Sequence, residues 1–157
     1  MLEIERKYLV RTLAFRKAAT SEKRIVQGFL NTHPERTVRV RIGGDDAFIT
    51  VKGKSDHKGL TRFEWEHRIS LQEAEELLKL CEQPLLEKIR YSVPAGDHIF
   101  EVDEFLGENK GLMIAEVELQ EETDIVQIPS WVGKEVTGQE QYYNSRLIKK
   151  PFKTWKL

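Results

Sequence analysis

Charged residues recur along this chain in pairs at alternate positions, with apolar residues between them. The clearest case is the segment Thr37-Val38-Arg39-Val40-Arg41-Ile42, in which two arginines alternate with aliphatic residues. A period of two residues is typical of a β-strand, because successive side chains point to opposite faces of a sheet. The segment therefore predicts a strand with one charged and one apolar face.

Six further segments alternate in the same way. They carry Glu3/Glu5/Lys7, Thr50/Lys52, Glu64/Glu66, Lys88/Arg90, Glu101/Asp103 and Glu116/Glu118. One such pair is typical of an ordinary exposed strand face. Like charges side by side repel, so their repetition indicates that something of opposite charge is held between them. Carboxylate pairs suit Mg²⁺ or Mn²⁺, and Lys and Arg pairs suit phosphate oxygens.

The whole pattern predicts an α+β chain that is mainly β. The expected strands are Leu2–Val10, Ile25–Leu30, Thr37–Ile42, Ala47–Gly53, Arg62–Ile69, Glu87–Val93, Ile99–Phe105 and Met113–Leu119. Ser70 and Glu73 form a capping-box pattern at the start of a helix. Further helices are expected from Pro129 to near Gly138 and over Tyr142–Lys149. Short hairpin links favour an antiparallel sheet.

Composition narrows the functional classes. The formal net charge is -1, from 25 basic and 26 acidic residues, which gives no general attraction to nucleic acid or to anionic membranes. Cys81 is the single cysteine, and its helical spacing predicts a buried apolar group. No secretory signal and no apolar run of membrane-spanning length is recognised, so we expect a single cytoplasmic domain over residues 1–157. The scattered histidines and the lack of a Gly-rich phosphate loop favour no other hydrolytic or nucleotide-binding motif.

A sheet curled into a barrel would bring both kinds of charged pair to a common interior. The apolar faces would then point outward, against the helices, which inverts the usual small barrel. The same alternation also fits an open sheet with an exposed charged face. A divalent metal together with a polyphosphate suggests phosphoryl transfer, in which positioning and charge neutralisation supply most of the catalysis.

The ordered set of segments resembles CYTH-domain proteins of the triphosphate tunnel metalloenzyme superfamily. The resemblance rests on Glu3-x-Glu5-x-Lys7, Gln27-Gly28-Phe29-Leu30, Val38-Arg39-Val40-Arg41, Thr50-Val51-Lys52, Gly59 to Glu66, Lys88-x-Arg90-Tyr91, Glu101-Val102-Asp103 and Ala115 to Leu119. It implies an eight-stranded antiparallel closed β-barrel with a few flanking helices, whose tunnel binds a triphosphate.

The same resemblance implies roles for individual residues. Phosphates would be held by Lys7, Arg39, Arg41, Lys52, Arg62, Lys88 and Arg90. One or two Mg²⁺ or Mn²⁺ ions would be held by Glu3, Glu5, Glu64, Glu66, Asp103, Glu116 and Glu118. Turnover is expected to depend on Lys7, Glu5 and Glu118.

The implied activity is metal-dependent hydrolysis of a linear triphosphate, with inorganic tripolyphosphate as first choice. Alternatives are a class IV-type adenylate cyclase, a thiamine triphosphatase, or a non-enzymatic module that binds polyphosphate, a nucleotide or RNA ends. Phe63, Trp65 and Tyr91 alternate out of phase with the charges, which disfavours base stacking and hence RNA.

Two departures from the family pattern are Phe29, where Tyr is common, and Gln139-Glu140-Gln141, where an Asp and an Arg are usual. A homodimer is expected from the apolar outer faces.

Overall fold

The computed structural model of the protein describes residues 1–156, which form nine strands and three α-helices. The strands are β1 (Leu2–Val10), β2 (Ser21–Asn31), β3 (Arg36–Gly43), β4 (Asp46–Ser55), β5 (Thr61–Ile69), β6 (Leu86–Ala95), β7 (His98–Phe105), β8 (Met113–Leu119) and β9 (Val132–Glu135). The helices are α1 (Phe15–Ala18), α2 (Leu71–Leu78) and α3 (Asn144–Lys149). Short 3₁₀ turns cover Gly107–Asn109, Glu140–Tyr142 and Phe152–Thr154.

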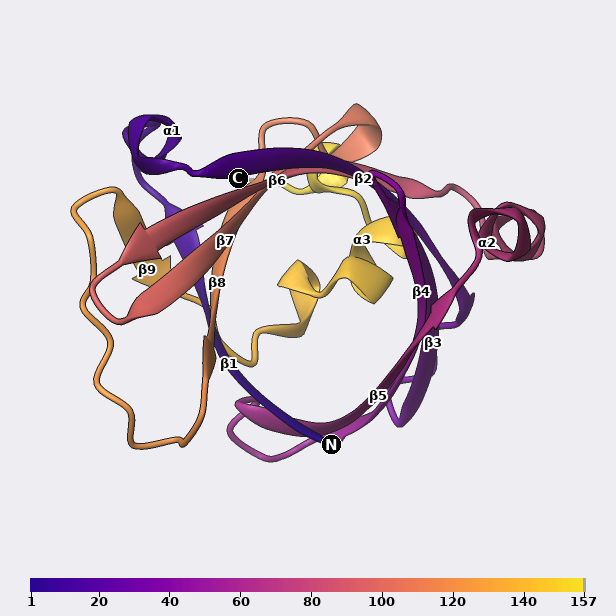
Figure 1. The fold of residues 1–157 in the computed structure, drawn as a ribbon, viewed down its shortest axis with the longest axis horizontal. Helices are drawn as coiled ribbons and strands as arrows, with labels where there is room; N and C mark the ends of the chain where they lie inside the picture. Colours follow the sequence, from indigo (N-terminus) through magenta and orange to yellow (C-terminus); the bar gives the residue numbers. More distant parts are fainter. Residues whose placement is uncertain (157) are drawn as a thin grey trace.

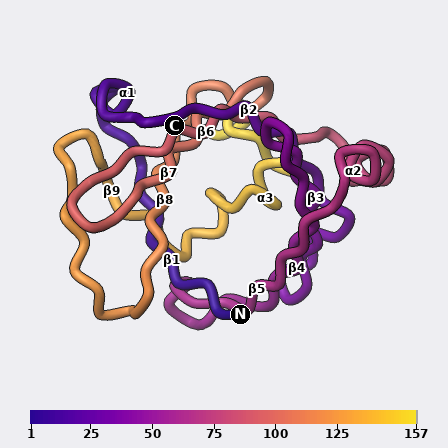
Figure 2. Tube along the Cα trace, in the orientation of Figure 1, coloured from indigo at the N-terminus to yellow at the C-terminus, as the bar shows by residue number. Residues whose placement is uncertain are grey.

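Eight of these strands close into an antiparallel barrel, as predicted (Figure 1). The order around the ring is β5-β4-β3-β2-β6-β7-β8-β1, and β1 pairs with β5 to complete it. At the closure Leu2 lies opposite Phe63 and Ile4 lies opposite Thr61. The Cα trace shows the same closed ring, with α2 outside it and α3 across its opening (Figure 2).

The predicted strands are confirmed, with small differences at their ends. The bounds of β1 and β8 are as predicted, whereas β2 begins at Ser21 and not at Ile25. The first residues of β2 are exposed and carry no apolar alternation, yet their backbone pairs with β6 from Ser21 opposite Ser92 onward. Exposed residues that pair only through their backbone do not alter the hydrophobic pattern, so the sequence did not predict this part of β2.

Helix α2 covers part of the outer surface of the barrel. It begins with the predicted capping box, in which the Ser70 hydroxyl accepts from the Glu73 backbone N–H and the Glu73 carboxylate accepts from the Ser70 N–H. Ala74, Leu78 and Cys81 are buried together with Val40 and Ala47 of the sheet. Burial raises the pKa of the Cys81 thiol, which suits the structural role predicted for it.

The helix predicted from Pro129 to Gly138 is wrong. The segment forms strand β9, which pairs with β1 through Tyr8 opposite Glu135 and Val10 opposite Val132. Isolated helices of this length are marginal in water, so tertiary pairing decides the local structure. Trp131 then enters an apolar cluster on the outside of the barrel.

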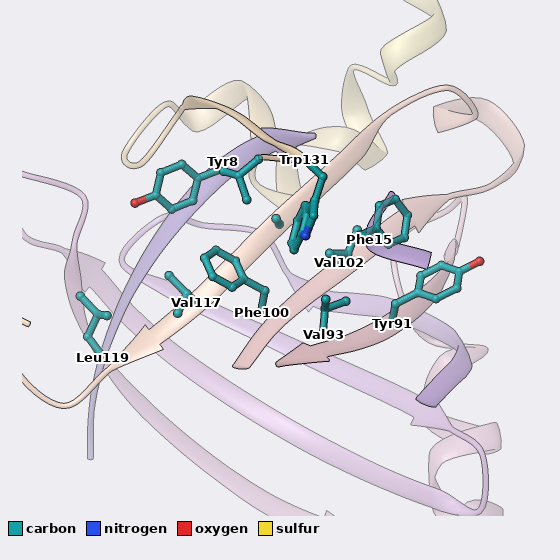
Figure 3. Packing of buried hydrophobic residues seen from close by; sticks show 11 residues of the cluster. Tyr8, Phe15, Tyr91, Val93, Phe100, Val102, Val117, Leu119 and Trp131 are labelled. Carbon is teal, nitrogen blue, oxygen red and sulfur yellow. The ribbon is translucent and has the colours of Figure 1, made fainter. Parts of the chain in front are cut away.

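That outer cluster is the largest apolar core of the described chain. Aromatic rings from distant segments meet there: Phe15 of α1 lies 5.2 Å from Tyr91, and Phe100 lies 5.5 Å from Trp131, between ring centroids (Figure 3). Tyr8, Val102 and Val117 line the same cluster. The apolar faces of β1, β6, β7 and β8 therefore point outward, as predicted, and the chain's own α1 and β9 segments cover them.

The interior of the barrel is charged over only part of its length. Phe29, Leu86, Phe105 and Ile114 continue the inward faces of their strands at one end, where they form a second buried cluster with Leu147 of α3. Figure 1 shows α3 across the opening of the ring, and Leu147 packs against this cluster, so the helix closes one end of the barrel. The helix and this cluster fill one end, and the charged side chains occupy the rest.

Two surface features bear on partners. None of the helices formed by residues 1–156 has the length and apolar character needed to cross a membrane. Phe63 and Trp65 on the outer face of β5 remain 45% and 38% exposed, so some apolar surface is left uncovered by residues 1–156. The homodimer stays a prediction.

Candidate active site

A cavity of about 270 Å³, here called the charged chamber, opens inside the barrel. Predicted site residues from six strands line it: Glu3, Glu5, Lys7, Arg39, Arg41, Lys52, Arg62, Glu64, Glu66, Lys88, Arg90, Glu116 and Glu118. The remaining predicted residue, Asp103, lies behind this wall and is 1% exposed. Strand alternation and barrel closure thus bring together charges that are far apart in the sequence.

Strand order gives the chamber a basic and an acidic side. The basic side comes from β4, β3 and β6, and β2 lies between β3 and β6. Its residues are Lys52, Arg39, Arg41, Lys88 and Arg90. The acidic side comes from β7, β8, β1 and β5, which complete the ring, and consists of Glu101, Glu116, Glu118, Glu3, Glu5, Glu64 and Glu66. Lys7 and Arg62 add two cations to the acidic side. A guest that spans the chamber therefore meets opposite charges on its two flanks.

Asp103 holds two of the basic residues in place. Its carboxylate accepts from Arg90 Nε at 2.7 Å and Arg90 Nη2 at 2.9 Å, and its Oδ2 lies 2.8 Å from Lys88 Nζ. Lys88 is also 1% exposed. Burial lowers the pKa of Lys88 to about 8, although Asp103 favours its charged form. Burial works to raise the pKa of Asp103, but Arg90 and Lys88 together lower it.

Lys7 and Lys52 contact carboxylates of the acidic side. Lys52 Nζ lies 2.9 Å from Glu3 Oε1 and 3.4 Å from Glu64 Oε2. Lys7 Nζ lies 3.8 Å from Glu116 Oε2 and 5.1 Å from the centre of the Tyr143 ring. Each ammonium group therefore offsets part of the negative charge that surrounds it.

The remaining carboxyl groups crowd together, and their pKa values shift accordingly. Burial and a hydrogen bond with Glu3 raise the pKa of Glu64 to about 7. Burial, followed by the charges of Glu116 and Glu3, raises the pKa of Glu5 well above its usual range. Burial opposes ionisation of Glu116, but Lys7 and a hydrogen bond from Glu5 lower its pKa. The acidic side thus holds two carboxyl pairs, Glu3 with Glu64 and Glu5 with Glu116.

Two guanidinium groups of the basic side, those of Arg39 and Arg41, are short of negative charge. Arg39 Nη2 donates to Thr50 Oγ1 at 3.1 Å and lies 3.5 Å from Glu66 Oε2, and Arg41 lies 3.7 Å from the same oxygen. Burial, Arg39 and Arg90 lower the pKa of Arg41 to about 10. The Nε of Arg39 is buried and has no hydrogen-bond partner within residues 1–156. The groups are arranged to receive a further anion.

The edge of β1 beside the chamber is shared by two strands. β5 pairs with its first half and β9 with its second half. Between them Leu60 O accepts from the Glu5 N–H at 3.1 Å, and Thr137 Oγ1 accepts from the Lys7 N–H at 2.9 Å. The two loops that supply these acceptors meet at Gly59 and Gly138, both of which have positive φ. A Cβ on Gly59 would lie 2.2 Å from Gly138 Cα, so only glycine permits this approach.

Several chamber residues were not predicted as site residues from the sequence. Glu101 and Thr50 alternate in phase with predicted residues, so the strand pattern could have found them. Phe29, Tyr143, Asn144 and Ser145 also line the chamber. Tyr143 and its neighbours reach it only because α3 closes one end of the barrel, and helical periodicity carries no signal for that.

The chamber of this closed barrel has a basic arc (the basic side) facing an acidic arc (the acidic side), an arrangement that suits a polyanion together with cations. The CYTH domain family matches residues 1–150, and the chain belongs to this family. It is 44% identical over 157 residues to an inorganic triphosphatase of Acetivibrio thermocellus, covering 98% of this chain and 97% of that protein. It is 38% identical to an inorganic triphosphatase of Nitrosomonas europaea, covering 94% of this chain and 97% of that protein.

A solved structure agrees with these sequence relatives. The crystal structure of an inorganic triphosphatase superposes with a TM-score of 0.65 at 34% identity, covering 93% of this chain and 97% of that chain. A protein from Pyrococcus horikoshii gives a TM-score of 0.62 at 19% identity, over 77% of this chain and 80% of that one. The second similarity bears on the fold alone.

Proposed function

We propose that this protein hydrolyses inorganic triphosphate with the help of a divalent metal ion. The observation that carries the proposal is the division of the chamber into a basic arc and an acidic arc. A linear triphosphate lies along the basic arc, and the carboxyl pairs face it from across the chamber. The names of the relatives, inorganic triphosphatase at 44% and 38% identity over nearly the whole chain, support the same substrate.

The basic arc would bind the phosphates directly. Arg39, Arg41 and Arg90 come from neighbouring parts of the ring, and Arg guanidinium groups bind phosphate oxygens with paired, charge-assisted hydrogen bonds. The buried Nε of Arg39, which has no partner within residues 1–156, is a donor suited to a phosphate oxygen. Lys7 and Lys88 supply ammonium groups at the α3 end. These groups would also stabilise the negative charge that develops on the phosphate oxygens during hydrolysis.

The acidic arc fits a divalent cation that is shared with the substrate. No three acidic, histidine or cysteine side chains within residues 1–156 converge as a ready-made metal site. Mg²⁺, however, commonly takes one or two carboxylates and completes its octahedron with water and substrate phosphates. The pairs Glu3/Glu64 and Glu5/Glu116 offer this number of ligands, and burial together with the neighbouring carboxyl groups raises the pKa of Glu5 and of Glu64. Such an ion would neutralise phosphate charge and activate a water molecule.

Glu66 and Glu118 line the same side and remain proposed ligands or water-orienting groups. For Asp103 the contacts favour a different role, because its oxygens already face Arg90 and Lys88. We assign Asp103 to positioning these two cations. Turnover is proposed to depend on Lys7, Glu5 and Glu118, all of which face the chamber.

A substrate panel tests the proposal. Tripolyphosphate, ATP and thiamine triphosphate are each incubated with Mg²⁺, with Mn²⁺ and with EDTA, and released phosphate and cyclic AMP are measured. We expect phosphate release from tripolyphosphate with either metal and none with EDTA. Cyclic AMP from ATP would indicate a cyclase, and tight tripolyphosphate binding without turnover would indicate a binding module; either result would overturn the proposal.

Two substitutions connect the activity to the chamber. Lys7→Ala and Glu5→Gln should each abolish most phosphate release while the far-ultraviolet circular dichroism spectrum stays unchanged. Lys79→Ala is the matched control, because Lys79 follows α2 outside the barrel and its side chain is 69% exposed. Unchanged turnover in both chamber variants would contradict the proposed site.

A further inference from the structure

An amide side chain lies where the charged chamber meets α3. Asn144 is the first residue of α3 and lines the chamber. Its Oδ1 accepts from Lys88 Nζ at 2.8 Å and from Gln27 Nε2 at 2.9 Å. Gln27 lies on β2, between β3 and β6 of the basic arc, and is fully buried.

The chemistry of these partners determines how the Asn144 amide is oriented. An ammonium group can only donate, so the atom of Asn144 that faces Lys88 must be the oxygen. The atom of Gln27 that faces the same oxygen must then be its nitrogen. This leaves Gln27 Oε1 buried with no hydrogen-bond partner within residues 1–156. An unsatisfied buried oxygen is destabilising, so Gln27 supports the Asn144 orientation at a cost to its own hydrogen bonding.

The amide nitrogen of Asn144, Nδ2, is the atom left to face the chamber. With its oxygen turned to Lys88 and Gln27, Asn144 has its Nδ2 group left for the chamber, and that nitrogen has no partner among the described residues 1–156. Lys88 contacts Asn144 directly, and Lys7 lies over the ring of the preceding residue, Tyr143. Two cations and two amide N–H donors therefore approach the same end of the chamber.

We propose that Asn144 binds a terminal phosphate group of the substrate through Nδ2, and that Gln27 is a positioning residue that keeps this amide turned toward the chamber. The inference rests on the proposed function, because the ligand is the end of a linear triphosphate. The phosphate oxygens accept from the amide and from the nearby ammonium groups. Because a neutral donor adds a hydrogen bond without a further repulsive cation, it suits a position already crowded by Lys7 and Lys88.

Two substitutions separate phosphate binding from a purely structural role. Asn144→Asp keeps an oxygen for Lys88 and Gln27 but replaces the donors with a negative charge. Asn144→Leu removes both the oxygen and the donors at similar size. If Asn144 only anchors Lys88, Leu is the more damaging change and Asp is mild. If it binds phosphate, Asp raises the KM for tripolyphosphate at least as much as Leu does, by about tenfold or more.

Binding is also measured without turnover. Tripolyphosphate is titrated calorimetrically into each variant in EDTA, where we expect the same order of losses, and thermal unfolding reports whether each variant is folded. Asn109→Asp is the matched control: Asn109 is buried outside the chamber, and its Oδ1 accepts from the Phe152 N–H at 2.8 Å. It should leave the KM unchanged. Gln27→Met should raise the KM without lowering the melting temperature, because it also removes the unsatisfied oxygen.

The outcomes distinguish the inference from the function on which it rests. One outcome is that the wild type hydrolyses tripolyphosphate while Asn144→Asp has an unchanged KM and unchanged metal-free binding. This outcome would overturn the role of Asn144 and leave the proposed function intact. Absence of wild-type turnover would overturn the proposed function itself, while the metal-free titration would still decide whether Asn144 binds the anion. Should Asn144→Asp fail to fold, the titration of Gln27→Met decides, and unchanged binding there would overturn the inference.

Discussion

Removal of the charge on Asp103 should destabilise the protein strongly. Asp103 is 1% exposed and is hydrogen-bonded to Arg90 on two nitrogens and to Lys88. Asp103→Asn leaves the buried Lys88 beside the partly buried Arg90 without the carboxylate that both cations share, although Arg90 keeps contacts with Glu101 and Glu116. Loss of one partner from a buried ion pair costs about 3–5 kcal/mol. For a chain of this length that corresponds to a fall in melting temperature of about 6–20 °C.

Glu101→Gln is the matched control, because Glu101 contacts the same arginine from an exposed position. Its carboxylate lies 3.3 Å from Arg90 Nη1, but its side chain is 48% exposed. Such a pair contributes about 0–1 kcal/mol. Urea unfolding at pH 7 in EDTA measures both variants, and an unchanged m-value shows that the transitions are comparable. Equal losses in the two variants, or a loss below about 1 kcal/mol for Asp103→Asn, would refute the argument that burial makes this pair important.

Three further perturbations test other parts of the structure. Gly59→Ala should lower the free energy of unfolding in urea by about 1–3 kcal/mol more than Gly44→Ala does. Both glycines have positive φ, but only a Cβ at Gly59 would collide with Gly138. Equal losses in the two variants would argue against the close approach of these loops. The pKa of Glu64 is about 7 in the folded chain and ordinarily 4.5, so the folded state binds more protons between these values, and metal-free stability should fall as pH rises through this window. Melting temperature measured against pH reports this loss of stability, and the loss should be smaller in Glu64→Gln than in the wild type. Identical pH profiles for the two proteins would contradict the pKa shift. Leu147→Ala should cost about 2–5 kcal/mol, because Leu147 is fully buried; a loss below 1 kcal/mol would show that α3 is not packed against one end of the barrel.

The strands were predictable because each carries its own evidence. Arg39 and Arg41 alternate with aliphatic residues, and a two-residue period is a local property that survives whatever the strand packs against. Ser70 and Glu73 likewise predict the start of α2, because the capping box is a contact between residues close in the sequence. Segments whose structure depends on distant partners were predicted less well. The segment around Val132 became a strand because the edge of β1 was available to it.

The site shows the same division between local and distant causes. The sequence by itself determined which residues are charged, which share a strand face, and therefore that like charges come in pairs that need a counterion. Only the tertiary structure decided that β4, β3 and β6 form a basic arc opposite the carboxylates of β7, β8, β1 and β5, since barrel closure sets which strands face one another. It also placed α3 across one end of the barrel, which made that end apolar and brought Asn144 to the chamber. The physical reason is that side-chain alternation is local along a strand, whereas facing across a barrel depends on contacts between residues far apart in the chain.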